Sequence, residues 1–134
     1  MHNDTLVPLL HNRSMRKIFL VEDDPGIRDT LEILLTTEGF LVQSFGAVAE
    51  FNRRDKSILP DLFIFDVMLP DGSGTDLCSE IKGNEDSQNV PVIIMSAHAD
   101  LEDISYECLP NDFIPKPFDI DDLLLRIDKT LNTY

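Results

Sequence analysis

Short apolar runs alternate along the chain with segments of helical character. Three runs are almost entirely apolar: 18–21 (IFLV), 62–65 (LFIF) and 90–95 (VPVIIM). A half-exposed strand alternates apolar with polar positions, so these unbroken runs predict strands that are buried on both faces. Two weaker segments, 40–45 and 113–115, complete the set of strands that we expect.

Apolar residues at helical spacing follow these strands. Between Ile27 and Leu35 they recur at intervals of three and four residues, which predicts an amphipathic helix. Asp24 before Pro25 is typical of an N-cap followed by proline in the first helical turn. The same spacing, weaker in the second case, is found in segments 120–131, 48–51 and 77–81.

The predicted order is strand then helix, repeated through the chain with short connections. Continuous apolar strands joined through helices predict an α/β fold: a doubly wound five-stranded parallel sheet with helices on both faces. A length of 134 residues suits one domain. We expect residues 1–14, which follow no periodic pattern, to be an N-terminal extension outside the core, and residues 15–134 to be the folded domain.

The composition restricts the partners that we expect. The net charge is −14, from 25 acidic and 11 basic residues. Such a surface repels phosphodiester backbones and anionic lipids, so direct binding to nucleic acid or membrane is not expected. Two cysteines make neither a disulfide framework nor a metal cluster, and they are typical of reduced thiols in a cytoplasmic protein.

Polar residues with useful chemistry follow four of the predicted strands. They are Glu22 and Asp23 after the first strand, Asp66 after the third, Ser96 after the fourth and Lys116 after the fifth. The carboxyl ends of parallel strands meet at one edge of a sheet, where open α/β folds bind ligands. We therefore expect these five side chains to lie close together.

Their combined chemistry points to phosphoryl transfer. Crowded carboxylates stay ionised only beside a cation, and oxygen ligands with open positions suit Mg²⁺. Lys116 can bind a phosphoryl oxygen or pair with a carboxylate, and Ser96 can donate to another oxygen. Asp66 is the best-placed nucleophile. Singly these signals are weak, because Asp66 could equally cap a turn and an acidic pair is usually a solvated surface feature.

Four motifs together resemble the receiver domain of two-component response regulators, the CheY-like superfamily. They are FLVEDDP (19–25), FDVMLPDG (65–72), MSAH (95–98) and FIPKPF (113–118). The resemblance covers roughly residues 15 to 133, essentially one whole domain. It implies the flavodoxin-like (βα)5 receiver fold and a switch in a phosphorelay. The protein would then be a phosphoacceptor that assists its own Mg²⁺-dependent phosphorylation and dephosphorylation, rather than an enzyme.

The resemblance also implies a metal site and a phosphoryl donor. Asp66 would accept a phosphoryl group from a sensor histidine kinase or a histidine phosphotransfer protein. Asp23, Asp66 and the backbone carbonyl of Met68 would bind Mg²⁺ directly, and Glu22 would act mostly through water.

Three further positions match the switch of the family. Ser96 matches the switch hydroxyl, Phe113 the aromatic switch residue and Lys116 the lysine that contacts the phosphoryl group. The bond between this lysine and the following Pro117 is commonly cis in the family. Phosphorylation would draw Ser96 and Phe113 inward and change the face formed by the fourth helix, the fifth strand and the last helix, altering which downstream protein it binds. We expect a monomer or a weak phosphorylation-dependent dimer.

One segment departs from the family pattern. Between Ser96 and Phe113 the chain is about two residues shorter than in most members, which would rotate the end of a helix by roughly 200°. The residues LPN at 109–111 replace a more usual Gly-Ala-Asp. We therefore expect the fourth helix, within 97–112, to be short or irregular.

Three other classes of function fit the sequence less well. A module that kept the fold but lost phosphorylation is disfavoured, because all the matched residues are present. A dehalogenase-type phosphatase needs a second aspartate two positions after the nucleophile, where this chain has Met68. A flavodoxin needs a neutral phosphate-binding loop after the first strand, whereas residues 22–24 are EDD.

Overall fold

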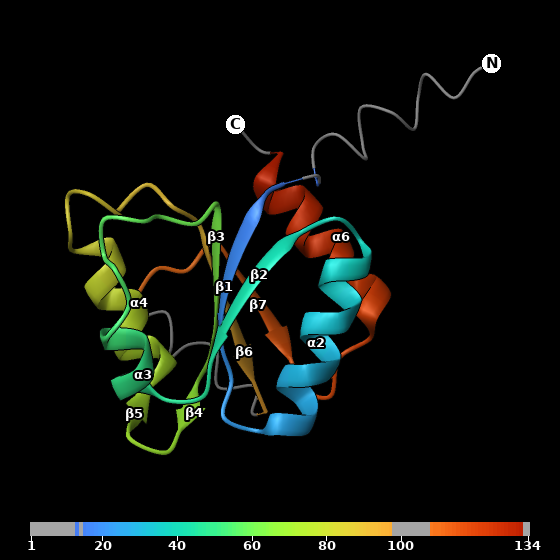
Figure 1. Cartoon of the computed structure of the whole chain (residues 1–134), viewed down its shortest axis with the longest axis horizontal. Coiled ribbons are helices and arrows are strands. Elements are labelled where there is room, and N and C mark those ends of the chain that lie inside the picture. The colour runs from blue at the N-terminus through green and yellow to red at the C-terminus, as the bar shows by residue number, and fades with distance from the viewer. Residues whose placement is uncertain (1–12, 14, 98–107, 133–134) are drawn as a thin grey trace.

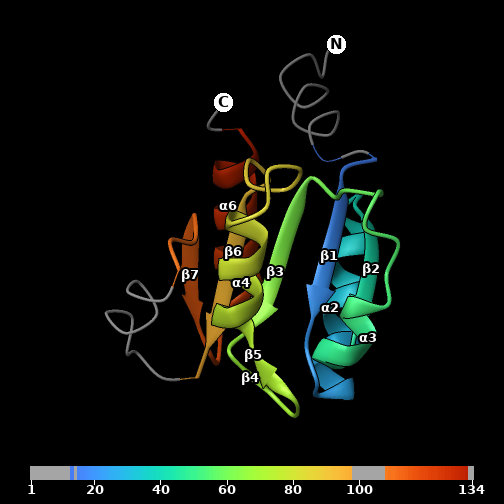
Figure 2. The ribbon, with the colours of Figure 1, turned by 90° about the vertical axis from the view of Figure 1, so that its left-hand side faces the viewer.

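A parallel sheet of five strands forms the centre of the molecule (Figure 1). The structure is a computed structural model that describes Arg13 and residues 15–97 and 108–132. The strands are β1 (Lys17–Val21), β2 (Leu41–Phe45), β3 (Leu62–Asp66), β6 (Val92–Ser96) and β7 (Asp112–Pro115). Their spatial order is β2-β1-β3-β6-β7 and every neighbouring pair is parallel, as Figure 2 shows face-on. The predicted sheet is thus confirmed.

Helices cover both faces of this sheet. Helices α2 (Pro25–Thr37) and α6 (Ile120–Leu131) lie on one face, and α3 (Val48–Asn52) and α4 (Gly74–Lys82) lie on the other (Figure 1). This arrangement confirms the doubly wound prediction. The expected fourth helix of the family pattern falls largely on residues 98–107, which lie outside the described residues. None of the described helices has the length and apolar character needed to cross a bilayer.

The central strand β3 divides its side chains between two cores. Leu62 and Ile64 point into a largely aliphatic cluster beneath α2 and α6, whereas Phe63 and Phe65 point into a phenylalanine cluster beneath α3 and α4. All four are fully buried, as their unbroken apolar run predicted. Successive residues of a strand face opposite sides, so one strand supplies both cores.

Edge-to-face ring contacts organise the phenylalanine cluster. Phe51 from the short helix α3 meets Phe45, Phe63 and Phe65 at centroid distances of 5.2, 6.0 and 5.4 Å. Each such pair adds about 0.5–1.5 kcal/mol to the burial of the rings. A helix of five residues is too short to be stable alone, so we attribute its position chiefly to Phe51. Cys78 in the same cluster is a buried free thiol whose pKa is raised by burial.

A small hairpin follows Asp66. In it β4 (Met68–Leu69) pairs antiparallel with β5 (Gly72–Ser73). The carboxylate of Asp71 accepts hydrogen bonds from the amides of Val48 and Ala49, at 2.8 and 2.9 Å. These backbone hydrogen bonds lower the pKa of Asp71. The hairpin is therefore attached to the first turn of α3.

At the amino edge of the sheet, Arg13 joins the ends of two helices. Its Nε donates to Asp128 Oδ1 of α6 at 2.9 Å, and its guanidinium also pairs with Glu38 at the end of α2. Arg13, which belongs to the N-terminal segment that we expected outside the core, thus contacts the domain. Gly39, which follows α2, has a φ of 101°, a value that suits glycine at the end of a helix.

Candidate functional site

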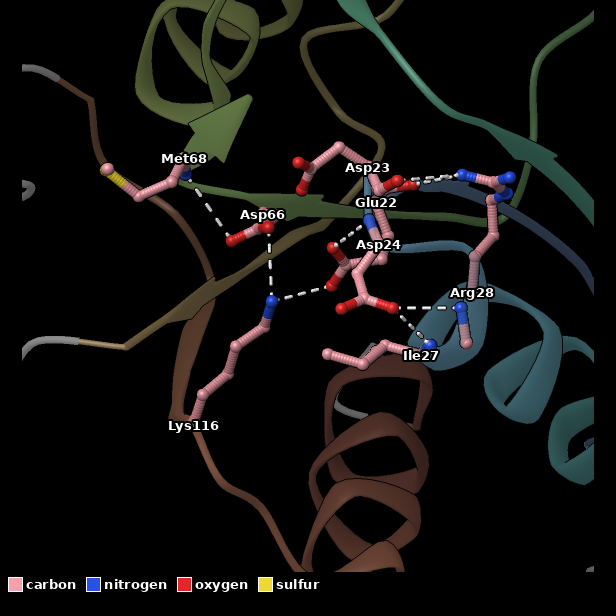
Figure 3. A network of polar contacts seen from close by, with 9 residues as sticks. Glu22, Asp23, Asp24, Ile27, Arg28, Asp66, Met68 and Lys116 are labelled. Carbon is pink, nitrogen blue, oxygen red and sulfur yellow. Dashed lines mark hydrogen bonds and ion pairs between the residues drawn. The ribbon is translucent and has the colours of Figure 1, made fainter. Parts of the chain in front are cut away.

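Three carboxylates meet at the carboxyl edge of the sheet. Glu22 and Asp23 follow β1, and Asp66 ends the adjacent strand β3. One oxygen from each lies within 4.8 Å of the others (Figure 3). Glu22 and Asp66 are buried, with exposed fractions of 0% and 4%, whereas Asp23 is exposed. The predicted acidic cluster is therefore formed, and it opens to solvent on the side of Asp23.

Lys116 reaches into this cluster from the end of β7. Its Nζ lies 2.6 Å from Glu22 Oε1 and 3.1 Å from Asp66 Oδ2 (Figure 3). The backbone amide of Lys116 donates to the carbonyl of Ser96 at 2.7 Å, which fixes the two strand ends side by side. The Lys116–Pro117 peptide bond is cis, as expected from the family pattern. One ammonium group thus forms ion pairs with two buried carboxylates.

Burial and like charge set the protonation of the cluster. Burial raises the pKa of Glu22 to about 7, and the charge of Asp66 adds to this rise. Hydrogen bonds from Lys116 and from the Asp24 amide act in the opposite direction but are outweighed. Burial alone would lower the pKa of Lys116, yet its hydrogen bonds to Glu22 and Asp66 and their charges raise it overall. Lys116 therefore remains a cation at neutral pH.

Helix α4 begins directly against the backbone of Asp66. A Cβ atom at Gly74 would lie 2.2 Å from the carbonyl oxygen of Asp66, so only glycine allows this approach. The amide of Gly74 donates to the carbonyl of Val67 at 3.1 Å, and the amide of Met68 lies 3.4 Å from Asp66 Oδ1. These contacts hold the acidic side chain between the hairpin and the helix.

The two predicted switch residues lie next to the acidic cluster along the sheet. Ser96 is buried at the end of β6, one position beyond Met95, which pairs with Asp66 in the register. Phe113 pairs with Ile94 and packs, half-buried, against the phenylalanine cluster. Ser96 thus shares the edge of the site, whereas Phe113 lies two residues behind it on the neighbouring strand.

Two features of the site were not predicted from the sequence. Arg28, in the first turns of α2, donates to the backbone carbonyls that follow β1. Asp71 ties the hairpin to α3, as described above. The only sequence signal for Arg28 is its position four residues after the N-cap Asp24, and many solvated arginines share that position. Asp24 itself caps α2 as predicted, accepting from the amides of Gly26 and Ile27.

The donor set of the cluster fits a hard divalent cation. All the side-chain atoms of the cluster that could bind a metal ion are carboxylate oxygens, the ligands that Mg²⁺ and Ca²⁺ prefer. Three carboxylates share one lysine, so a divalent ion would balance the excess of negative charge that they carry when ionised. The exposed Asp23 leaves a path for the ion and its water from solvent.

Comparison with known proteins identifies the family. The family model of the response regulator receiver domain matches residues 18–128. The chain belongs to the response regulator receiver domain family. It is 38% identical over 118 residues to the transcriptional regulatory protein GltR of Pseudomonas aeruginosa, covering 87% of this chain and 49% of GltR. The chain spans half or less of such curated relatives; for the regulator NtrC of Proteus hauseri the share is 25%.

Solved structures agree with this assignment. A CheY-like receiver domain protein from Methanospirillum hungatei superimposes with a TM-score of 0.81 at 28% identity, covering 90% of this chain and 96% of that one. The response regulator TrrA of Thermotoga maritima, in complex with Mg²⁺-BeF, has a TM-score of 0.75 at 25% identity, covering 87% and 99%. This receiver domain is a phosphoacceptor signalling switch of the two-component type.

Proposed function

We propose that Asp66 is the phosphoacceptor of this receiver domain and that its donor is the phosphohistidine of a sensor histidine kinase or a histidine phosphotransfer protein. The observation that carries the proposal is the position of one carboxylate. Asp66 is buried at the end of the central strand β3, 3.1 Å from Lys116 Nζ and within 4.8 Å of two further carboxylates. A nucleophile held beside a cation at the mouth of a parallel sheet suits phosphoryl transfer.

The acidic cluster would hold Mg²⁺ during this reaction. Asp23, Asp66 and the backbone carbonyl of Met68 would bind the ion directly, and Glu22 would act mostly through water. When bound, Mg²⁺ would neutralise charge on the phosphoryl oxygens. The complex of the relative TrrA with Mg²⁺-BeF supports this choice of ion.

The chain's own residues then carry the transfer. An oxygen of Asp66 bonds to phosphorus while the bond from phosphorus to the donor nitrogen breaks. The imidazole leaves with the electron pair of that bond, as a neutral ring whose other nitrogen carries a proton. Lys116, which already contacts Asp66, binds a phosphoryl oxygen, and the Ser96 hydroxyl donates to another. Attack of water on the same phosphorus later releases phosphate and restores Asp66, so the domain assists both directions of the switch.

The output of the switch would follow from movement at the site edge. Ser96 moving toward the phosphoryl oxygens leaves space into which Phe113 moves. Phe113 belongs to β7, so the surface around β7 and α6 changes with it. We propose that an unidentified downstream protein recognises this surface, and that the domain is a monomer or a weak phosphorylation-dependent dimer.

The wider context is proposed in the same way. We take residues 15–134 as the receiver domain and place it in the cytoplasm, where its two buried cysteines stay reduced. The net charge of −14 disfavours direct contact of this domain with nucleic acid or an anionic membrane.

A phosphoryl analogue provides the test. We expect Mg²⁺ with beryllofluoride to raise the melting temperature of the wild-type domain, because a ligand of the folded state stabilises it. The melting curve is best followed by circular dichroism, since the chain contains no tryptophan. Asp66→Asn keeps the size of the side chain but removes the nucleophile, and we expect no rise in this variant.

Phosphotransfer gives the second measurement. Incubation with a panel of autophosphorylated histidine kinases should label the wild-type domain and leave Asp66→Asn unlabelled. A response to beryllofluoride that is equal in the two proteins, or no response in either, would contradict the proposal. It would favour a module that kept the fold and lost phosphorylation.

A further inference from the structure

Arg28 binds the backbone of residues 22–24, the acidic turn that follows β1. This residue lies in α2, one turn beyond the N-cap Asp24. Its Nη1 donates to the carbonyl oxygen of Glu22 at 2.9 Å and to that of Asp23 at 3.3 Å (Figure 3). Both carbonyls belong to residues whose carboxylates form the acidic cluster. Arg28 thus acts on the backbone that carries these side chains, and its own charge takes no part in the ion pairs of the cluster.

The neighbouring turn leaves room for this guanidinium. A Cβ atom at Gly46, which follows β2, would lie 3.0 Å from Arg28 Nη1. The amide of Gly46 donates to Glu50 Oε1 at 2.6 Å, which fixes the turn in place. The amide of Glu22 in turn donates to the carbonyl of Phe45 at 3.0 Å. The guanidinium therefore occupies a space bounded by α2, the acidic turn and the turn at Gly46.

The acidic turn is consequently held from two directions. The Asp24 carboxylate accepts from the amides of Gly26 and Ile27, which ties the turn to the start of α2. Arg28 binds the carbonyls of the two residues before Asp24. Groups that orient metal ligands from outside the ligand set commonly change metal affinity by about 10- to 100-fold when they are removed.

We propose that Arg28 is a positioning residue that presets the carboxylates of Glu22 and Asp23 for the divalent cation, and that Gly46 leaves the guanidinium room to do so. This inference rests on the proposed function, because it presumes that the acidic cluster binds Mg²⁺. In this inference Arg28 strengthens Mg²⁺ binding, although its own positive charge would weaken it. A cation beside a cation site repels the incoming ion, so an arginine acting only by charge would weaken Mg²⁺ binding.

The sign of the change therefore tests the inference. Arg28→Met keeps an unbranched apolar stem but removes both the donors and the charge. We expect it to raise the Kd for Mg²⁺ about 10-fold in a calorimetric titration with the magnesium salt alone. Arg28→Lys keeps the charge and can donate to one of the two carbonyls, so we expect a smaller rise. Gly46→Ala places a methyl group against the guanidinium, so we expect a small rise of the Kd without any change in charge.

Arg54→Met is the matched control. Arg54 also donates to a backbone carbonyl, that of Phe51 at 3.0 Å, and its guanidinium stacks on the ring of the same residue. It lies after α3, away from the acidic turn. We expect Arg54→Met to lower the melting temperature while leaving the Kd for Mg²⁺ unchanged, which separates a general loss of stability from a loss of positioning.

The outcomes separate this inference from the proposed function. If the wild-type domain binds no Mg²⁺, the proposed cation site is wrong. If the wild type binds Mg²⁺ and folded Arg28→Met binds it equally or more tightly, the cation site stands and Arg28 does not position it. Should Arg28→Met fail to fold, Arg28→Lys decides: a raised Kd supports the inference and an unchanged Kd overturns it.

Discussion

Two clusters at opposite edges of the sheet each pair one basic side chain with two carboxylates. At the carboxyl edge Lys116 contacts Glu22 and Asp66. At the amino edge Arg13 contacts Glu38, which caps the end of α2, and Asp128 of α6. The two clusters contain similar residue types, but their side chains differ in how much they are exposed to solvent.

The difference in solvent exposure changes the electrostatics of the two clusters. The carboxylates beside Lys116 have side chains that are 0% and 5% exposed, and the exposed Asp23 adds a third acid. Burial there raises the pKa of Glu22 to about 7. At the other edge the side chains of Arg13 and its partners are 21–35% exposed. The hydrogen bond to Asp128 leads the interactions that raise the pKa of Arg13, against the lowering effect of burial.

The comparison separates a functional cluster from a structural one. Burying like charges opposes folding, so a buried excess of carboxylates indicates a site that a cation completes. A half-exposed arginine between two helix ends needs no ligand, and it joins segments that are far apart in the chain. Three changes test this distinction, from the largest expected effect to the smallest.

Removing the buried cation should have the largest effect. In Lys116→Met two buried carboxylates lose their partner, and such losses cost about 3 kcal/mol or more of the free energy of unfolding. We expect a loss of about 3 kcal/mol at about pH 8, measured by urea denaturation and circular dichroism. Mg²⁺ should restore part of it, because the cluster becomes more negative. Lys56→Met, at an exposed position, is the control. Equal stability of the two variants would contradict a buried ion pair.

Titration of the buried acid should have the next largest effect. The pKa of Glu22 is raised from 4.5 to about 7 in the folded state, so the folded protein binds this proton more tightly than the unfolded chain. Its contribution to stability therefore falls as the pH rises from about 4.5 to about 7 and stays constant above that. The raised pKa of Lys116 affects the stability only above its ordinary pKa of 10.5, outside this pH range.

The measurement is the free energy of unfolding without divalent ions. We expect the wild-type domain to lose about 2 kcal/mol between about pH 5 and about pH 7. The matched variant Glu22→Gln should not show this decrease. A decrease of the same size in both proteins would assign it to another group.

Much of the fold and of the carboxyl edge was predictable because the signals are local. Buried parallel strands require unbroken apolar runs such as 62–65, and parallel strands bring their carboxyl ends to one edge. From these two rules the sequence predicted that Glu22, Asp66 and Lys116 would meet. The capping of α2 by Asp24 was predictable too, since an N-cap and the following proline are adjacent in the chain.

The unpredicted contacts join residues without a shared local pattern. Arg13 and Asp128 are 115 residues apart, and Asp71 and Val48 are 23 apart. Arg28 is closer in sequence to its partners, but these are backbone carbonyls, which every residue has. Such contacts depend on where the folded chain brings each side chain, so composition and periodicity do not indicate them.

The smallest effect should come from the amino edge. Arg13→Ala removes the hydrogen bond of 2.9 Å to Asp128 and the ion pair with Glu38. Half-exposed pairs contribute little, so we expect a loss of about 1 kcal/mol in urea denaturation, and less at high salt. The Kd for Mg²⁺ should stay unchanged, because the cation site is at the other edge. Arg16→Ala is the control, since Arg16 forms no ion pair within residues 15–97 and 108–132. If Arg13→Ala weakened Mg²⁺ binding, the two edges would be coupled and the separation of a structural cluster from a functional one would fail.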